Sequence, residues 1–172
     1  IDARWSDYIY QTGVASSNNI SISGGTQATK YYGSIGYTQQ NGVFRKNSFD
    51  RKSVLFNVDS KANSWLSVGG KINYVNENNS SGMSTGAAGN STASGVMART
   101  AIITAPIVGP YNADGSYNST SNGFVGIGDN AGHLNQSRLG FYNPVISLNN
   151  NYSVNNVNNI QSNIYLQITP FP

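Results

Sequence analysis

Residues Asn18–Thr38, with the sequence NNISISGGTQATKYYGSIGYT, contain the pattern that decides the fold. Polar and apolar residues alternate on both sides of Gly24-Gly25, a pair that favours a turn because glycine lacks a Cβ. Alternation with a period of two is typical of a β-strand whose two faces meet different surroundings. The stretch therefore predicts two strands joined by a turn, with Ile20, Tyr31 and Ile35 on an apolar face and Ser21, Tyr32 and Ser34 on a polar face.

The same alternation predicts three more strands, over residues 49–59, 66–76 and 160–169. The linkers after the first and third strands are short, whereas the fourth and fifth strands are separated by a long stretch without strand pattern. Short turns on one side and long loops on the other are typical of outer-membrane barrels. Aromatic residues near strand ends, as at Tyr37 and Tyr74, suit a membrane interface.

Composition narrows the class of protein. Charged residues make up 10% of the 172 residues, against about 25% in ordinary soluble domains. Apolar runs stay well below the roughly 18 residues that a membrane helix needs. The absence of cysteine excludes a disulfide framework within this chain. A net charge of +3 without a basic stripe argues against nucleic acid as a partner.

The predicted fold class is all-β: part of a transmembrane antiparallel β-barrel, with one long extracellular loop. About five strands cannot close such a barrel, which needs at least about eight. Alternation alone fits a soluble β-sandwich adhesin or carbohydrate-binding module equally well, so that alternative stays open. The predicted divisions are residues 1–16 as a lead-in, 17–78 with four strands, 79–154 as the extracellular loop and 155–172 with the fifth strand.

Several motifs together resemble one family. The block Ser21–Tyr37 with its Gly-Gly and Tyr-Tyr pairs resembles the start of the barrel in SusC/RagA-family TonB-dependent outer-membrane transporters. Further matches follow in the same order along the chain: Trp5-Ser6-Asp7-Tyr8-Ile9, Phe49-Asp50-Arg51, Trp65-Leu66-Ser67-Val68-Gly69, Tyr111-Asn112-Ala113-Asp114-Gly115-Ser116-Tyr117 and Tyr142-Asn143-Pro144.

The resemblance implies a location, a role and a set of partners. Members of the family lie in the outer membrane of Gram-negative, Bacteroidetes-type cells and import glycans or peptides. They pair with a SusD-like surface lipoprotein and draw energy from TonB through an N-terminal part that this chain lacks. The chain is accordingly expected to be an internal excerpt of a longer transporter surrounded by outer-membrane lipid, with residues 1–16 leading from plug to barrel and no enzymatic activity.

Two groups of residues are candidates for contact with cargo. Aromatic residues in and beside the long loop could stack on a sugar, pack against a lid protein or simply anchor the loop: Tyr111, Tyr117, Phe124 and Tyr142. Polar residues on the inward face could line an import path or simply wet the barrel interior: Tyr32, Asn73, Gln161 and Tyr165.

No catalytic residue, cofactor or metal site is predicted. His133 is the chain's single histidine, and a hydrolase would have to use it, but a loop histidine is the preferred interpretation. The glycines of residues 126–132 miss the spacing of a dinucleotide-binding motif. The alternating oxygens of residues 112–118 include one acid and no bidentate Glu, which favours a turn over a Ca²⁺ site.

Overall fold

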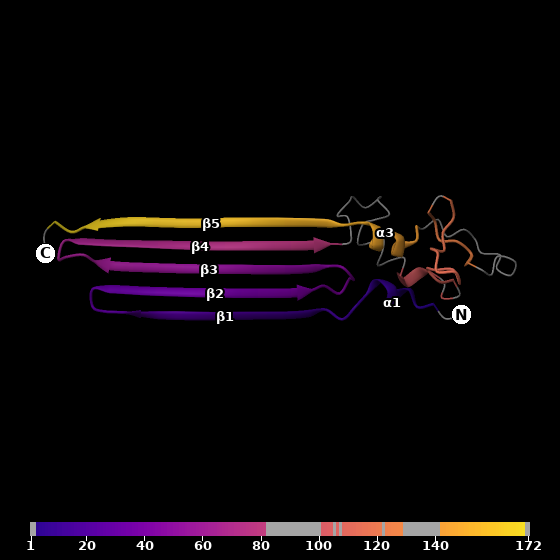
Figure 1. The fold of residues 1–172 in the computed structure, drawn as a ribbon, viewed down its shortest axis with the longest axis horizontal. Helices are drawn as coiled ribbons and strands as arrows, with labels where there is room; N and C mark the ends of the chain where they lie inside the picture. Colours follow the sequence, from indigo (N-terminus) through magenta and orange to yellow (C-terminus); the bar gives the residue numbers. More distant parts are fainter. Residues whose placement is uncertain are drawn as a thin grey trace. The chain divides into compact units, whose positions relative to one another are not determined.

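The computed structural model describes residues 3–81, 101–104, 106, 108–121, 123–128 and 142–170. Its five strands form one sheet in the order β1-β2-β3-β4-β5, and neighbours run in opposite directions (Figure 1). The predicted all-β fold is confirmed, and so is the unclosed sheet. The elements are α1 (Trp5–Ile9), β1 (Val14–Gly25), β2 (Thr29–Asn41), β3 (Ser48–Lys61), β4 (Leu66–Ser81), α3 (Pro144–Asn150) and β5 (Ser153–Ile168).

The chain divides into two compact units. The sheet unit contains most of the five strands and consists of Val14–Gln40, Ser48–Asn79 and Val154–Pro172. The loop unit consists of Ile1–Gly13, Asn41–Asn47 and Ser80–Ser153. Its three segments are those that precede β1, join β2 to β3 and join β4 to β5. The division into residues 1–16, 17–78, 79–154 and 155–172 stays a prediction.

Side-chain oxygens close both short turns of the sheet unit. Between β1 and β2, Thr26 Oγ1 accepts hydrogen bonds from the amides of Ala28 and Thr29, at 3.2 and 3.1 Å. Between β3 and β4, Asn63 Oδ1 accepts from the amides of Trp65 and Leu66, at 3.0 and 2.8 Å. Such side chains replace the missing strand partners of a turn. The predicted turn at Gly24-Gly25 was placed slightly early, because β1 continues to Gly25.

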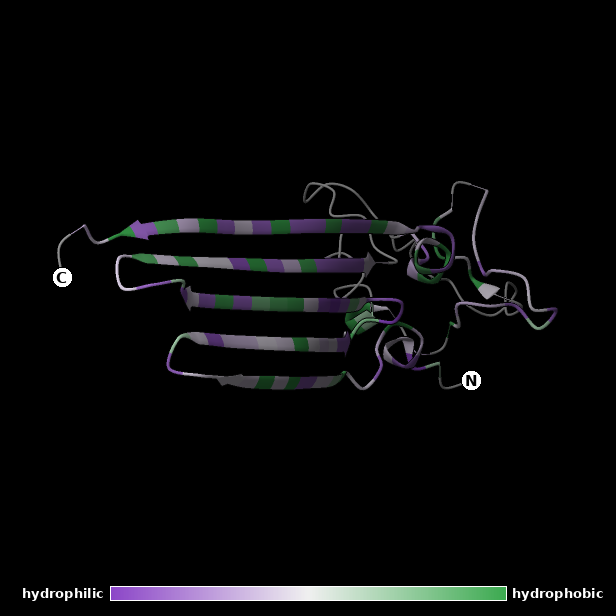
Figure 2. Ribbon diagram, turned by 60° about the vertical axis from the view of Figure 1, so that its left-hand side comes forward, coloured by the Kyte–Doolittle hydropathy of each residue, from purple (hydrophilic) through white to green (hydrophobic). Residues whose placement is uncertain are grey.

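The predicted two faces of the sheet are confirmed by what surrounds its glycines. A Cβ on Gly33 would lie 3.6 Å from Ile22 Cγ2 and 3.8 Å from the Phe56 ring, which places this position on the apolar face. A Cβ on Gly36 would instead meet Ser53 Oγ and Asn19 Oδ1 on the polar face. Figure 2 shows the resulting alternation of hydrophobic and hydrophilic residues along the strands.

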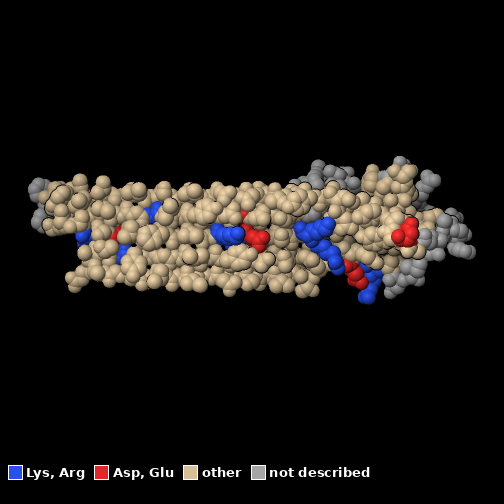
Figure 3. Space-filling view, in the orientation of Figure 1, with Lys and Arg blue, Asp and Glu red and all other residues tan. Residues whose placement is uncertain are grey.

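The apolar face of the sheet unit is exposed. Ile20 is 79% exposed, and Ile164 and Leu166 are 86% and 70% exposed. A contiguous exposed apolar surface marks contact with a membrane or another protein. Figure 3 shows where basic and acidic side chains lie over the strands, including an adjacent pair midway along them.

The loop unit has a small core of its own. Trp5 and Ile9 are spaced one helical turn apart in α1, lie on the same side and are buried. Trp5 Nε1 donates to the Val108 carbonyl at 2.8 Å, α1 contacts α3, and Leu148 packs with Phe44. The described residues with buried hydrophobic side chains all lie in this unit: Ala3, Trp5, Ile9, Val108, Val145 and Leu148.

Two helical segments lie in the connection between β4 and β5. Residues 101–103 are helical, and residues 82–100 before them lie outside the described part. The helix α3 was not predicted. Its signal was present, because Asn143 caps the helix by accepting from the Val145 amide at 3.1 Å and Pro144 stands at its first position. No helix within the described residues has the length and apolarity to cross a membrane.

Candidate functional site

The loop unit contains a cleft of about 470 Å³. It is formed by the end of α1, the connection between β2 and β3, the turn that begins at Tyr111, and α3. Aromatic, cationic and amide side chains meet there above buried aliphatic ones. The lining residues are Asp7, Tyr8, Gln11, Arg45, Lys46, Tyr111, Val145, Leu148 and Asn149.

Tyrosines form one wall of the cleft. The ring of Tyr111 stacks on that of Tyr117 with centroids 5.4 Å apart, and the ring of Tyr8 lies 6.1 Å from Tyr111 at 58°. Asn149 Nδ2 donates to the Tyr111 hydroxyl at 3.1 Å. The stack and this hydrogen bond hold Tyr111 in place, while Tyr8 keeps 38% of its surface exposed.

A tight turn brings Tyr111 and Tyr117 together. Gly115 adopts a φ of 85°, which residues with a Cβ rarely adopt. Asp114 Oδ1 accepts from both the amide and the hydroxyl of Ser116, at 2.8 and 2.6 Å. These hydrogen bonds, first the hydroxyl and then the amide, stabilise the carboxylate and lower the pKa of Asp114 below its usual 3.8. The Asp114 carboxylate therefore stabilises the predicted turn.

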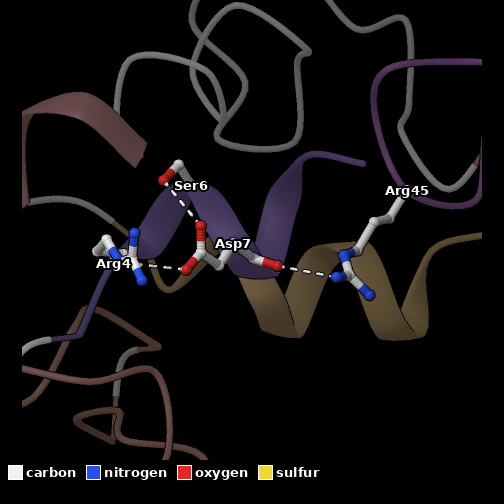
Figure 4. A network of polar contacts seen from close by, with 4 residues as sticks. All are labelled: Arg4, Ser6, Asp7 and Arg45. Atoms are coloured by element: carbon white, nitrogen blue, oxygen red, sulfur yellow. Dashed lines mark hydrogen bonds and ion pairs between the residues drawn. The ribbon is translucent and has the colours of Figure 1, made fainter. Parts of the chain in front are cut away.

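Cationic side chains form another part of the lining. Arg45 donates through Nη2 to the Asp7 carbonyl at 2.9 Å and through Nε to the Tyr10 carbonyl at 3.2 Å. Figure 4 shows that the carboxylate of Asp7 turns instead toward Arg4, at 3.4 Å, and Ser6. Lys46 Nζ donates to the Asn149 carbonyl at 3.2 Å. Carbonyl oxygens orient both cations but do not neutralise them.

A buried asparagine fixes the loop behind the cleft. Asn143 is 1% exposed and donates to the carbonyls of Pro110 and Asn118, at 2.9 and 3.1 Å. Asn118 in turn donates to the Gly109 carbonyl and accepts from the Gly128 amide. Buried amides with their bonds satisfied rigidify a loop, so Tyr111 is carried on a defined frame.

Comparison with known proteins shows which proteins the chain resembles in sequence and structure. No family profile matches it. It is 36% identical over 119 residues to TonB-dependent receptor P3 of Formosa agariphila, a match that covers 69% of this chain and 12% of the relative. It is 35% identical over 54 residues to TonB-dependent receptor SusC of Bacteroides thetaiotaomicron, covering 31% of this chain and 5% of SusC. Among solved structures, the RagAB peptide transporter matches 99% of this chain and 18% of its own, at 25% identity and a TM-score of 0.61.

In sequence and in fold, the chain is similar to a segment of SusC/RagA-type TonB-dependent receptors. A second RagAB structure, the peptide importer in its closed-closed state, shows the same fold at 24% identity and a TM-score of 0.63. The chain spans about an eighth of the first relative's length, 12%. Its unclosed sheet is similar to part of the RagAB fold, and the names of its relatives indicate no catalytic activity.

The predicted loop aromatics separate into two pairs. Tyr111 lines the cleft and Tyr117 stacks behind it. Phe124 and Tyr142 form a second pair, with centroids 4.7 Å apart, and neither lines the cleft. That pair joins two parts of the loop by a β-bridge, which suits an anchor. Contact of any of the four with cargo stays a prediction.

The predicted inward-facing residues lie on the polar face of the sheet, and Tyr165 lines a recess there. Tyr165 donates to Asp59 Oδ1 at 2.5 Å, and its ring covers Gly69. The recess has a volume of about 220 Å³ and includes Lys30, Lys61 and Gln167. Tyr32, Asn73 and Gln161 do not line it. Whether these four residues line an import path also stays a prediction.

Sequence reasoning missed the cationic and N-terminal walls of the cleft. Tyr8, Arg45 and Lys46 come from two segments that alternation assigns to no strand face, so their meeting was not visible in the pattern. His133 and residues 129–132 lie outside the described residues. Across the described part of the chain, no three His, Cys, Asp or Glu side chains are grouped to hold a metal ion.

Proposed function

We propose that this chain is one part of the wall of an outer-membrane importer, together with the extracellular loop that meets the cargo. The observation that carries the proposal is the exposed apolar face of the sheet. In water, leaving large aliphatic side chains exposed forgoes about 1.5–3 kcal/mol for each one that would otherwise be buried. Hydrocarbon removes that loss, so lipid is the surrounding that suits this face.

The length of the strands supports the membrane setting. A membrane-crossing strand needs about 9–11 residues, and these strands have between 12 and 16. Hydrogen bonds between polar side chains replace the apolar face near the end of β4 and the start of β5. Tyr74 donates to Asn158, and Asn76 donates to Asn156 and Asn158. We place the membrane surface near Tyr74, the loop unit outside the cell and the Thr26 turn in the periplasm.

The wider machine is inferred from the relatives. The matched structures are of a peptide importer, RagAB, and the matched sequences are of TonB-dependent receptors, including SusC. We therefore propose an importer of oligosaccharides or peptides that uses TonB and a SusD-like surface lipoprotein, in the outer membrane of a Bacteroidetes-type cell. The sources of two relatives, Formosa agariphila and Bacteroides thetaiotaomicron, support this cell type. The loop-unit cleft is the proposed point of first contact with cargo.

A soluble β-sandwich is the less favoured alternative. A sandwich buries one face of each sheet against the other. Ile20, Ile22 and Ile164 are between 66% and 86% exposed, and no described segment of the sheet unit covers them. The alternative therefore leaves this face without a partner.

Cysteine accessibility tests the membrane setting directly. The chain has no cysteine, so the variants Ile164→Cys and Asn163→Cys, each in an otherwise cysteine-free full-length protein, report the two faces of β5. In intact outer membranes, the Ile164→Cys thiol should resist a water-soluble maleimide and the Asn163→Cys thiol should react. Equal rapid labelling of both variants would overturn the proposal. Uptake of labelled oligosaccharides or peptides, lost on deletion of the gene or of TonB, tests the transport step.

A further inference from the structure

The cleft of the loop unit has an excess of positive charge. Arg45 and Lys46 line it beside the single carboxylate of Asp7, which is already paired with Arg4. Among the described residues, the remaining ion pair is Arg51–Glu77, outside the loop unit. Arg45 and Lys46 therefore have no carboxylate partner in the described part of the chain, and each keeps N–H donors beyond those used on carbonyls.

The backbone holds Lys46 in an unfavourable conformation. Its φ is 64°, in the left-handed region that residues with a Cβ rarely adopt. Asn47 N donates to the Phe44 carbonyl and Gly42 N to the Asn47 carbonyl, and this fixes the tight connection between β2 and β3. The turn thus presents two adjacent cations, Arg45 and Lys46, to one cleft.

The rest of the lining suits a polar ring. Tyr8 offers a partly exposed aromatic surface, on which the C–H face of a sugar can pack. Gln11 and Asn149 also line the cleft, and their side-chain amides can donate hydrogen bonds to, and accept them from, sugar hydroxyl groups. Peptides are commonly held through backbone bonds to a strand edge, whereas this cleft is lined by side chains.

We propose that the cleft binds a carboxylate-bearing sugar of an acidic oligosaccharide. The carboxylate lies between Arg45 and Lys46, and the ring packs on Tyr8 and beside Tyr111. The two adjacent cations give charge-assisted hydrogen bonds, which are stronger than neutral ones. This inference rests on the proposed importer function, because it names the class of cargo that the same cleft selects.

The test uses the full-length protein in detergent and two matched probes. Tetragalacturonate carries a carboxylate on each ring, and its methyl ester has the same rings without charge. Calorimetry should show the acid binding at least about tenfold more tightly than the ester, which is the size expected of one charged hydrogen bond. Raising the salt concentration should weaken the acid alone. Equal affinities would overturn the inference.

Variants separate the cleft from general charge effects. Lys46→Asn removes one cation, and asparagine tolerates the left-handed backbone, so the fold should be kept. It should weaken the acid about tenfold and leave the ester unchanged. Lys52→Gln removes one charge from β3, outside the loop unit, and should change neither. Equal losses in both variants would overturn the assignment to this cleft, and so would no loss for Lys46→Asn.

Two further measurements distinguish this inference from the proposed function. Tetraglutamate serves as an acidic peptide, and tighter binding of tetraglutamate than of tetragalacturonate would overturn the choice of a sugar. Uptake is measured separately in cells. Import of neutral cargo with no preference for the acid would support the importer function and contradict the proposed acidic cargo. Tight binding of the acid without import of any cargo would support the binding site and contradict the importer function.

Discussion

The two units of the chain treat apolar side chains in opposite ways. In the sheet unit, Ile164 and Leu166 are 86% and 70% exposed. In the loop unit, Ile9 and Leu148 are 0% and 2% exposed, and even the amide of Asn143 is buried. The loop unit follows the usual rule of soluble proteins, whereas the sheet unit reverses it.

On the proposed function, the difference arises because two solvents shape one short chain. A unit in water must cover its apolar side chains with its own atoms. A sheet in a bilayer can leave them to lipid but must pair every backbone group, which strands do through their neighbours. The exposed aliphatic residues of the sheet are therefore what the proposed membrane setting requires. Substitutions in each unit test whether the sheet unit is stabilised by lipid and the loop unit by its own buried core.

The largest effect is expected from a charge placed on the apolar face. Ile164→Arg should destabilise the folded barrel by about 2–4 kcal/mol, because a cation near the bilayer midplane loses its hydration. Asn163→Arg, on the neighbouring polar face, should cost little. The measurement is urea unfolding of the full-length protein in lipid vesicles. Similar costs at both positions would mean that the face of Ile164 is not in lipid.

The next effect concerns the polar face, where a tyrosine covers a glycine. Gly69→Val should cost about 1–3 kcal/mol through overpacking, because its Cβ would overlap the Tyr165 ring and crowd Asp59. Gly70→Val is the control, since a Cβ there meets just the Asn163 carbonyl at 3.8 Å. Heat-modified mobility of the barrel in gels reports folding. A second change, Tyr165→Ser, should recover part of the loss in Gly69→Val; no recovery would argue against the ring as its cause.

These two positions also show how much the sequence could predict. The alternation around Ile164 predicts a strand and its apolar face, because lipid or core imposes the period of two. The extra length of β4 and β5 could not be predicted, because asparagine occupies both faces beyond Tyr74 and before Ile160. Nor could the packing of Tyr165 on Gly69, because it depends on the register between two strands far apart in the chain.

The cleft was less predictable than the sheet. Tyr111 and Tyr117 were identified because they are aromatic residues of the long loop. Tyr8 and Lys46 were missed because their nearness depends on tertiary packing between α1, the β2–β3 connection and α3. A local pattern carries period and turn signals, whereas this site is assembled from segments without a shared period.

A smaller effect is expected from the frame of the loop unit. Asn143→Ala removes donors to Pro110 and Asn118 and the cap of α3, and should destabilise the loop unit by about 1–3 kcal/mol. The control Asn150→Ala removes one exposed bond, to the Ile146 carbonyl, and should have little effect. Hydrogen exchange at the Val145 amide measures the change. Equal loss of protection in β3 would show that the effect of Asn143 is not confined to the loop unit.

The smallest effect is a dependence on pH at the turn of Asp114. The pKa of this acid is lowered in the folded protein because Ser116 donates to the carboxylate through its hydroxyl and amide. A lowered pKa means that the stabilisation is present above the ordinary value of 3.8 and is lost as the pH falls through the folded pKa. Hydrogen exchange over residues 112–117, corrected for intrinsic rates, should therefore show less protection below about pH 4. Asp114→Asn keeps an oxygen that accepts from Ser116 at every pH, so its protection should not change with pH. Loss of protection in the variant over the same range would assign the pH effect to another group. It would also leave the tyrosine wall of the cleft independent of the charge on Asp114.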